Sequence, residues 1–149
     1  MVAPGTILLV EDNPDDEELT LRALRNARVC NEIHVVRDGA EALEYLFCEG
    51  AYAGRDPSGP PQVVLLDLRL PKVSGLEVLR SVRADPRTRQ QPVVVLTSSD
   101  MERDIAQAYE LGANSFVTKP VAIEDFTNAV KQVGIYWLLI NRGPSGASA

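Results

Sequence analysis

The chain has 149 residues, of which 45% are hydrophobic and 24% are charged, a composition that fits one globular domain with a sizeable core. Its net charge of -6 at pH 7 argues against direct binding to nucleic acid, because phosphate backbones are held by clustered Lys and Arg. No apolar run reaches the roughly 18 residues of a membrane span, and no basic segment precedes the first apolar run. These features predict a cytoplasmic protein without membrane contact.

Five short aliphatic or β-branched runs alternate with longer amphipathic segments. The runs extend from Thr6 to Val10, Ile33 to Val36, Val63 to Leu68, Val93 to Thr97 and Ser115 to Thr118. Such alternation predicts a parallel sheet with helices between the strands. The first, third and fourth runs are almost wholly apolar, as expected of central strands that are covered on both faces.

Local signals mark where the helices begin. Asn13 followed by Pro14 resembles a helix N-cap with proline at the first helical position. Two further starts show a serine three residues before a glutamate, the spacing of a capping box. These pairs are Ser74 with Glu77 and Ser99 with Glu102. The segment from Glu49 to Pro61 is rich in Gly and Pro, and we interpret it as a mobile surface loop rather than a domain linker.

This order of elements predicts a flavodoxin-like (βα)5 fold of the α/β class, a doubly wound parallel sheet with strand order 2-1-3-4-5. Open α/β sheets bind ligands at the carboxyl ends of their strands, beside the point where the strand order reverses. In this order the point lies between the first and third strands. The residues there are Glu11, Asp12 and Asp67, so three carboxylates are expected to converge.

Six acids fall within the eight residues from Glu11 to Glu18. The last four of them lie in the first turns of a predicted helix, where negative charge complements the helix dipole by about 0.3 to 1 kcal/mol each. We interpret these four as helix stabilisers: Asp15, Asp16, Glu17 and Glu18. Glu11 and Asp12 precede the cap, and helix stabilisation does not explain their position.

Asp67 interrupts an apolar run at a position that should be largely covered. Because buried carboxylates without partners are costly, and clustered ones repel each other, three of them should recruit a divalent ion or take up a proton. His34 is the only histidine, and Cys30 and Cys48 lack the spacing of paired ligands, so a metal must use oxygen ligands. Carboxylates with room for waters suit Mg2+. On spacing alone, the acids also fit a satisfied polar rim of the sheet.

Hydroxyl and ammonium groups follow the fourth and fifth strands. Thr97 and Ser98 end the fourth run, and Lys119 with Pro120 follows the fifth. In the predicted strand order all of them open onto the same crevice as the acids. Thr97 can donate to a phosphoryl oxygen, and Lys119 and Mg2+ can neutralise others. Together these groups match what phosphoryl transfer to a carboxylate requires.

With these residues in place, the chain resembles a response-regulator receiver domain of two-component signalling over residues 5–141. The segments "VED", "LLDLRLPKVSG", "VVLTSS" and "SFVTKP" occur in the family's order and spacing. The resemblance implies a single-domain regulator that takes a phosphoryl group from a sensor histidine kinase on Asp67 and signals by protein contacts or phosphorelay. It implies self-catalysed phosphotransfer and autodephosphorylation, but no other enzyme activity.

The resemblance also implies a role for each residue of the acidic site. Asp67 is the phosphoacceptor, and Glu11, Asp12, Asp67 and the backbone carbonyl of Arg69 hold Mg2+. The alternative is a magnesium-dependent phosphatase with a carboxylate nucleophile, which would need a second acid two residues after Asp67, where Arg69 stands. A flavin- or nucleotide-binding module would need a Gly-rich loop after the first strand, where this chain carries acids.

The remaining roles concern signal output. By resemblance Thr97 is the switch hydroxyl, Phe116 the switch aromatic and Lys119 the phosphate-binding lysine, often followed by a cis peptide at Pro120. A phosphate beside Thr97 would draw its hydroxyl inward and let Phe116 fill the vacated space. The surface formed by the fourth helix, the fifth strand and the fifth helix would then change.

Two segments, "RDGAEALEYL" and "AYELGANSFVTKPV", and a long final helix resemble the stand-alone regulators paired with bacterial phytochrome histidine kinases. The final helix has a predicted core stripe of Ile123, Phe126, Val130, Val133, Trp137 and Ile140. Tyr136, Leu138 and Leu139 lie off this stripe, so the last turns are apolar almost all round. We expect a homodimer or kinase contact there, the alternative being packing on the domain's own edge. Residues 142–149 are expected to be a disordered tail.

Overall fold

The computed structural model describes residues 5–27, 29, 31–56, 59–97, 102–119 and 121–133. Strands and helices alternate along these residues, as the sequence predicts. The elements are β1 (Ile7–Val10), α1 (Pro14–Asn26), β2 (Ile33–Val36), α2 (Gly39–Phe47), the 3-10 turn η1 (Gly50–Tyr52), β3 (Val63–Asp67), α3 (Gly75–Ala84), β4 (Val93–Thr97), α4 (Glu102–Glu110), β5 (Ser115–Thr118) and α5 (Ile123–Val133).

The five strands form one parallel sheet in the order β2-β1-β3-β4-β5, which confirms the predicted fold and strand order. Strands β2, β4 and β5 have the predicted bounds, and β1 and β3 are each one residue shorter than predicted. Every residue of β1, β3 and β4 is buried, whereas β2 and β5 at the edges are only partly covered. The central apolar runs are therefore the central strands.

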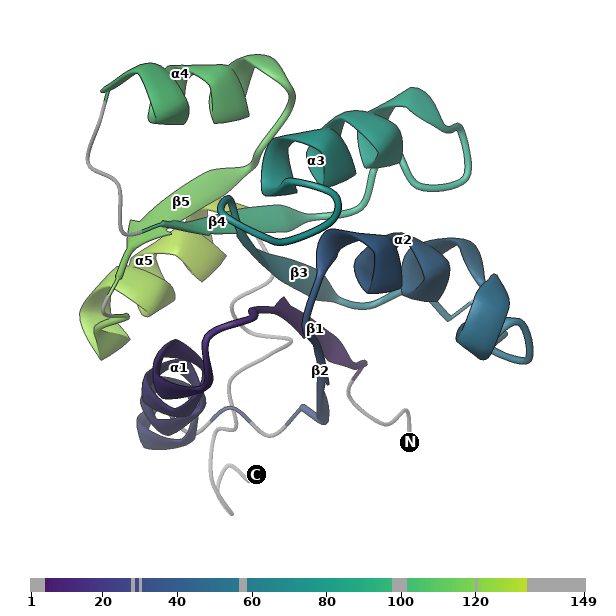
Figure 1. Cartoon of the computed structure of the whole chain (residues 1–149). Coiled ribbons are helices and arrows are strands. Elements are labelled where there is room, and N and C mark those ends of the chain that lie inside the picture. The colour runs from purple at the N-terminus through teal and green to yellow at the C-terminus, as the bar shows by residue number, and fades with distance from the viewer. Residues whose placement is uncertain are drawn as a thin grey trace.

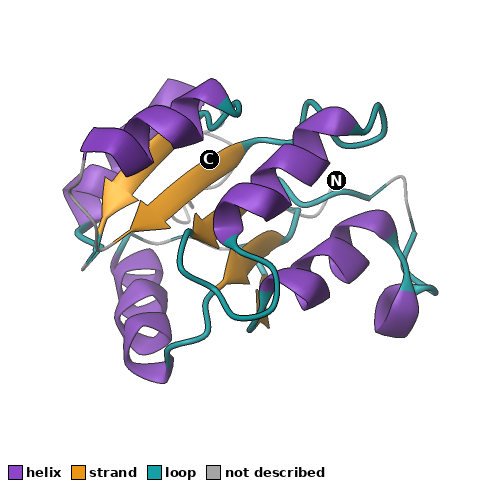
Figure 2. Cartoon of the chain, turned by 45° about the horizontal axis from the view of Figure 1, so that its top comes forward, coloured by secondary structure: helices purple, strands orange, loops and turns teal. Residues whose placement is uncertain are grey.

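Helices cover both faces of the sheet (Figures 1 and 2). Helices α2, α3 and α4 lie on one face, and α1 and α5 lie on the other. Alternate residues of each central strand point to opposite faces, so the sheet has two apolar cores. In β1, Leu8 and Val10 belong to the first core and Ile7 and Leu9 to the second. This double coverage explains why the central runs lack polar alternation.

Side-chain caps fix the starts of three helices. The side chain of Asn13 accepts from the backbone N–H groups of Asp15 and Asp16 at 2.9 and 3.0 Å, and Pro14 begins α1, as predicted. The side chain of Ser74 caps α3 in the predicted way, by accepting from Glu77 N at 3.2 Å. Asp38 caps α2. Ser99, the predicted cap of α4, lies outside the described residues.

The predicted surface loop before β3 is more structured than expected. It contains η1, and the Arg55 side chain fastens it to the end of α2. The Arg55 guanidinium donates to the carbonyl oxygens of Tyr45 and Gly59, both at 2.8 Å, and of Leu46 at 3.4 Å. The carbonyls of Tyr45 and Leu46 belong to the last turn of α2, where an arginine can satisfy groups that lack helical partners.

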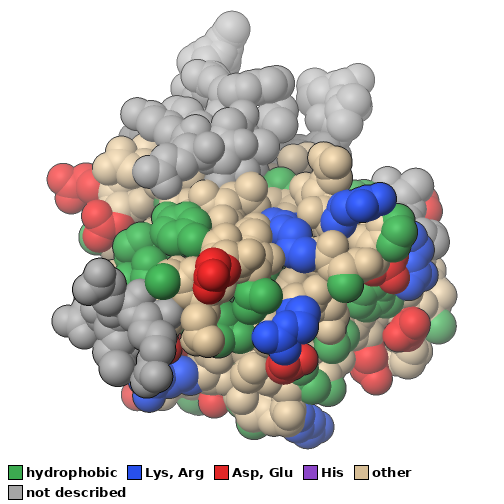
Figure 3. Space-filling model, turned by 90° about the horizontal axis from the view of Figure 1, so that it is seen from above, with side chains coloured by type: hydrophobic (Ala, Val, Ile, Leu, Met, Phe, Trp, Pro, Cys, Tyr) green, Lys and Arg blue, Asp and Glu red, His purple; other side chains and the backbone are tan. Residues whose placement is uncertain are grey.

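Several sequence predictions fall outside the described residues: the cis peptide at Pro120, the hydroxyl of Ser98, Cys30, the apolar last turns around Trp137 and the tail at 142–149. Within α5, Phe126 of the predicted core stripe is fully buried. In the part of the chain that is described, no helix has the length and apolarity to cross a bilayer. On the face seen from above, Lys and Arg side chains lie among acidic and apolar ones (Figure 3).

Candidate functional site

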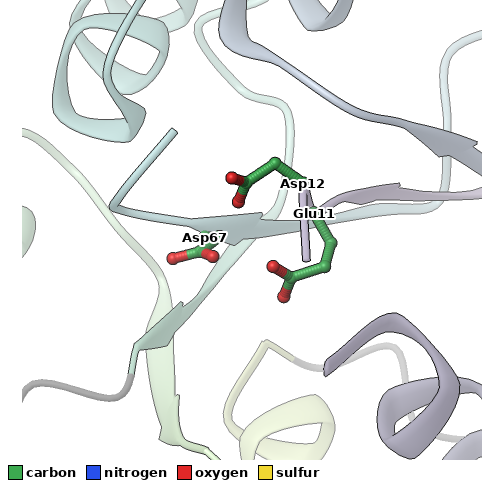
Figure 4. Close-up of side chains that lie close together, drawn as sticks. All are labelled: Glu11, Asp12 and Asp67. Carbon is green, nitrogen blue, oxygen red and sulfur yellow. The ribbon is translucent and has the colours of Figure 1, made fainter. Parts of the chain in front are cut away.

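Three carboxylates gather at the carboxyl ends of β1 and β3 (Figure 4). Val10 pairs with Leu66 across these strands, so Glu11 and Asp67, which follow them, emerge side by side. Glu11 N also donates to Val36 O at 3.0 Å, which extends the pairing of β1 with β2 by one residue. The parallel register therefore brings together acids that are 56 positions apart in numbering (67 minus 11).

The three carboxylates suit a divalent cation. Glu11, Asp12 and Asp67 each offer an oxygen, and these oxygens lie within 4.8 Å of one another. Glu11 is fully buried, Asp67 is 5% exposed and Asp12 is exposed, so the cluster is deep on one side and open to water on the other. Mg2+ fits such a set, because it prefers oxygen ligands and keeps several waters.

Both oxygens of Asp67 accept hydrogen bonds. Oδ1 accepts from the backbone N–H of Arg69 at 3.0 Å, and Oδ2 accepts from Lys119 Nζ at 3.0 Å. The turn after Asp67 is fastened by Gly75, whose N–H donates to Leu68 O at 3.0 Å. A Cβ on Gly75 would lie 2.3 Å from the Asp67 carbonyl oxygen, so only glycine lets α3 start this close to β3.

Lys119 places a positive charge among the acids. Its Nζ donates to Glu11 Oε1 at 2.9 Å, Asp16 Oδ2 at 2.8 Å and Asp67 Oδ2 at 3.0 Å, and its side chain is only 7% exposed. Its backbone N–H donates to Thr97 O at 2.8 Å, so the pairing of β5 with β4 delivers it to the site. Burial lowers the pKa of Lys119, but its hydrogen bonds to Asp16, Glu11 and Asp67 raise it more, and the ammonium stays charged.

The Glu11 carboxyl holds its proton more tightly than an ordinary glutamate. Burial is the main cause, and the neighbouring Asp67 adds to it, so the pKa of Glu11 rises to about 7 although Lys119 opposes the shift. Two carboxylates this close resist full ionisation unless positive charge compensates them. A cation at the site would supply that compensation.

The interpretation of Asp16 as a helix stabiliser is incomplete, because its carboxylate also binds Lys119. Side chains in a helix lean toward its N-terminus, which here points to the crevice, so a residue in the first turn can reach the site. This lean of helical side chains is the feature by which the sequence could have indicated the contact of Asp16 with the site. The helix-stabilising interpretation is sufficient for exposed Asp15 and for Glu18, which pairs with Arg22 and Arg25 at 3.5 and 3.7 Å.

Of the two predicted switch residues, Thr97 lies beside the acidic cluster and Phe116 lies in β5, near α4 and α5. Thr97 is 1% exposed at the end of β4, one residue after Leu96, which pairs with Asp67. Phe116 of β5 is partly buried, and its ring meets the ring of Tyr109 edge-on at 5.9 Å. It also borders a hollow of about 300 Å³ between α4, β5 and α5. The hollow is lined by Tyr109, Ser115, Phe116, Val117, Thr118, Asp125, Asn128 and Ala129.

Sequence comparisons find close relatives that span most of the chain. The chain is 44% identical over 145 residues to "Probable methanogenesis regulatory protein FilR2" of Methanothrix harundinacea, covering 97% of this chain and 90% of that protein. It is 38% identical over 135 residues to response regulator Rcp1 of Synechocystis, covering 91% of this chain and 90% of Rcp1.

Solved structures agree with this fold. The bacteriophytochrome response regulator AtBRR matches with a TM-score of 0.85 and 52% identity, covering 95% of this chain and 100% of that one. The Mn(2+)-bound form of Rcp1 has a TM-score of 0.74 and 37% identity, with 91% and 95% covered. The phosphorylated cyanobacterial phytochrome response regulator RcpA has a TM-score of 0.75 and 43% identity, with 91% and 95% covered.

The profile of the response regulator receiver domain matches residues 7–131. Members of that family are signalling proteins, and their standard mechanism is phosphorylation on an aspartate in an acidic pocket that binds Mg2+. A separate phosphatase activity is not favoured by this kinship. The chain therefore belongs to the response regulator receiver domain family, and it resembles the phytochrome-linked response regulators within it.

Proposed function

We propose that Asp67 is the residue that accepts the phosphoryl group from a sensor histidine kinase. The observation that carries this proposal is the contact of Asp67 Oδ2 with the buried ammonium of Lys119, next to two further carboxylates. Asp67 is held by both the Arg69 backbone N–H and the lysine. Glu11 is held in the same way, by Asn13 N and Lys119, but it is fully buried, whereas Asp67 is 5% exposed. A nucleophile fixed in this way needs little reorientation before it attacks.

Mg2+ is the proposed cofactor, held by Glu11, Asp12, Asp67 and the backbone carbonyl of Arg69. The support is the acidic cluster, which is open on the Asp12 side, and the Mn(2+)-bound structure of the relative Rcp1. When bound, the ion would neutralise charge on the transferring phosphoryl oxygens. Without it the pocket carries more negative than positive charge, which disfavours an anionic phosphoryl donor.

In the proposed transfer, Asp67 attacks phosphorus while the bond from phosphorus to the kinase's histidine nitrogen breaks, and the electron pair of that bond returns to the imidazole. Lys119 donates a hydrogen bond to a phosphoryl oxygen as negative charge shifts there. Attack of water on the acyl phosphate then releases inorganic phosphate and restores the Asp67 carboxylate. The protein catalyses only its own modification and its own reset.

Output is proposed to run from Thr97 to the surface of α4, β5 and α5. A phosphoryl group on Asp67 would draw the Thr97 hydroxyl inward, and the ring of Phe116 would move into the space that opens. Two features support this route. Phe116 is only partly buried at the margin of the first core, and it borders the hollow between these elements, so its ring has space on one side.

The proposed partners follow from the relatives and the sequence. A sensor histidine kinase is the phosphoryl source, and a bacterial phytochrome kinase is the candidate because AtBRR and RcpA are named as phytochrome response regulators. We also propose a homodimer through α4, β5 and α5 and the apolar C-terminal turns. The receiver domain is proposed to extend over residues 5–141. A cytoplasmic location and no direct contact with nucleic acid complete the proposal.

Incubation with acetyl phosphate and Mg2+ tests the phosphoacceptor. We expect intact mass spectrometry to show the addition of one phosphoryl group in the wild type and none in Asp67→Asn, and peptide mapping to place the group on Asp67. Asp85→Asn is the matched control, because Asp85 pairs with Arg87 on the surface after α3, and it should be labelled like the wild type. An unlabelled wild type, or equal labelling of Asp67→Asn, would refute the proposal.

The homodimer needs a separate measurement. Light scattering coupled to gel filtration should give the mass of two chains, and truncation after Val133 should lower the fraction of dimer because it removes the apolar turns. A mass of one chain for the full protein, both with and without a phosphoryl mimic, would refute the dimer but leave the phosphoacceptor untouched.

A further inference from the structure

Lys119 is held by a carboxylate that the proposed phosphoryl transfer does not use. Asp16 comes from the first turn of α1, and its Oδ2 lies 2.8 Å from Lys119 Nζ, the shortest of the three contacts of that ammonium. The turn is fixed, because the Asn13 side chain accepts from the backbone N–H groups of Asp15 and Asp16. Asp16 is therefore placed beside Lys119 by the helix cap as well as by its charge.

All three N–H groups of the Lys119 ammonium can be accounted for. An ammonium group has three donors, and Lys119 Nζ has three carboxylate acceptors within 3.0 Å, on Glu11, Asp16 and Asp67. A phosphoryl oxygen that arrives at the site finds no unused donor on Lys119. One of the three contacts must break before Lys119 can bind it.

The three carboxylates that contact Lys119 differ in whether a positive charge other than Lys119 can compensate them. Glu11 and Asp67 belong to the cluster suited to a divalent cation, whereas Asp16 does not, so Lys119 is its positive partner at the site. Asp16 also differs in exposure: its side chain is 34% exposed, against 0% for Glu11 and 7% for Asp67. Water can take over the Asp16 carboxylate when Lys119 leaves it, since a partly exposed charge is solvated at little cost.

We propose that Asp16 is a positioning residue that competes with the phosphoryl group for Lys119 and thereby slows the phosphorylation of Asp67. The proposal deepens the proposed function and rests on it. Asp16 acts in two ways: it occupies a donor of Lys119, and it adds a negative charge near the path of an anionic donor. Removing that charge while keeping the shape of the side chain should make Lys119 more available.

The test compares the rates at which acetyl phosphate labels the variants in the presence of Mg2+, followed by intact mass over a range of donor concentrations. Asp16→Asn should raise the ratio of maximal rate to KM by about three- to fivefold, the size expected of a partly exposed ion pair. Asp15→Asn is the matched control, because Asp15 lies in the same first turn of α1 and lacks the contact with Lys119. It and the charge-conserving Asp16→Glu should stay close to the wild type.

A second measurement reports binding without transfer. Beryllofluoride is an anionic phosphoryl mimic, and fluorine NMR with Mg2+ should show tighter binding to Asp16→Asn than to Asp15→Asn by a similar factor. A purely structural role of Asp16 would weaken both readouts. If Asp16→Asn does not fold, Asp16→Ala serves instead, because alanine has a high helix propensity and also removes the charge.

The outcomes separate the two proposals. If the wild type is labelled on Asp67 but Asp16→Asn matches Asp15→Asn or is slower, competition for Lys119 is refuted and the phosphoacceptor stands. If the wild type itself is not labelled, the proposed function fails, and the Asp16 proposal fails with it.

Discussion

Lys119 Nζ lies 3.0 Å from Asp67 Oδ2, although 52 positions separate the two residues in the chain. The strand order explains this contact, because Asp67 ends β3 and Lys119 follows β5 on the same edge of the sheet, with β4 between them. The side chain of Lys119 reaches across the end of β4 to the acids. The buried ammonium of Lys119 is thus shared by the carboxylates of Glu11, which follows β1, of Asp16 in α1 and of Asp67 in β3.

Removal of the Lys119 ammonium should lower both the free energy of unfolding and the rate of phosphorylation. Lys119→Met leaves buried carboxylates without their positive partner, so we expect the free energy of unfolding in EDTA to fall by about 3 kcal/mol. Phosphorylation by acetyl phosphate should slow about 100-fold or more, the usual cost of losing a group that stabilises developing charge. Urea denaturation and intact mass measure the two effects.

Lys72→Met is the matched control for Lys119. The Lys72 side chain is 69% exposed, and its Nζ lies 3.6 Å from Asp38 Oδ2, so it makes a surface ion pair of small energetic weight. Its loss should change the unfolding free energy by less than about 1 kcal/mol. Equal destabilisation by the two substitutions would contradict the account of Lys119 as the counterion of a buried cluster.

Magnesium affinity should depend on pH through Glu11. The pKa of Glu11 is raised to about 7 in the metal-free protein, so below this pH the carboxyl is mostly protonated and Mg2+ must displace the proton. Affinity should therefore rise with pH, by up to about tenfold per unit, and level off above about 7. Calorimetric titration with Mg2+ checks this when it is repeated at steps of ~0.5 pH unit from about pH 5.5 to about pH 8.5.

Glu11→Gln removes the titrating group and serves as the control for this pH dependence. Its affinity for Mg2+ should be lower at pH 8 but nearly constant between about pH 6 and 8, because glutamine does not ionise. A wild type with constant affinity over the same range would show that Glu11 does not bind the ion as a carboxylate, or that its proton is not retained.

The close packing of Gly75 against β3 should not tolerate a methyl group. In Gly75→Ala the Cβ would lie 2.3 Å from Asp67 O and 2.6 Å from Leu68 Cα, both backbone atoms that cannot turn away. We expect a loss of about 1 to 3 kcal/mol in the free energy of unfolding, together with slower phosphorylation because Asp67 shifts. Gly54→Ala is the control: a Cβ there meets nothing within 4 Å, and stability should not fall. Urea denaturation of both variants decides the matter.

Tyr52 should ionise at an unusually high pH, so the stability of the fold should depend on pH in the alkaline range. Its hydroxyl donates to Glu41 Oε2 at 2.7 Å, and His34 Nε2 lies 3.0 Å from the Tyr52 hydroxyl oxygen. Burial, with help from Glu41, raises the pKa of Tyr52 to about 12. Since the folded state holds the proton more tightly than the unfolded state, this contribution to stability is present below pH 10 and is lost as the pH rises toward 12.

Ultraviolet absorbance of tyrosinate follows this ionisation directly. Tyr52→Phe should remove the late component, which is the part of the absorbance change that appears as the pH approaches about 12. It should also lower the free energy of unfolding at about pH 8 by about 1 kcal/mol, the contribution of one hydrogen bond. Tyr109→Phe is the control, because the Tyr109 residue is 45% exposed and should cost less than about 0.5 kcal/mol. The account is wrong if the late component persists in Tyr52→Phe.

The sequence by itself determined the architecture and the position of the acidic cluster. Fully apolar runs identify β1, β3 and β4 as central strands, because a strand covered on both faces has no polar alternation. Asn13 with Pro14 and Ser74 with Glu77 locate two helix starts, because capping is a local interaction. Strand order then sends Glu11, Asp12 and Asp67 to one edge of the sheet.

Only the tertiary structure decided which charges touch. Asp16 and Glu18 have the same local pattern, yet Asp16 binds a buried lysine and Glu18 meets surface arginines. Likewise, the Gly- and Pro-rich segment before β3 gives no sign that Arg55 clamps it to the end of α2. Local periodicity fixes which face a side chain takes, but contacts across elements depend on distances of a few ångströms set by how helices pack on the sheet.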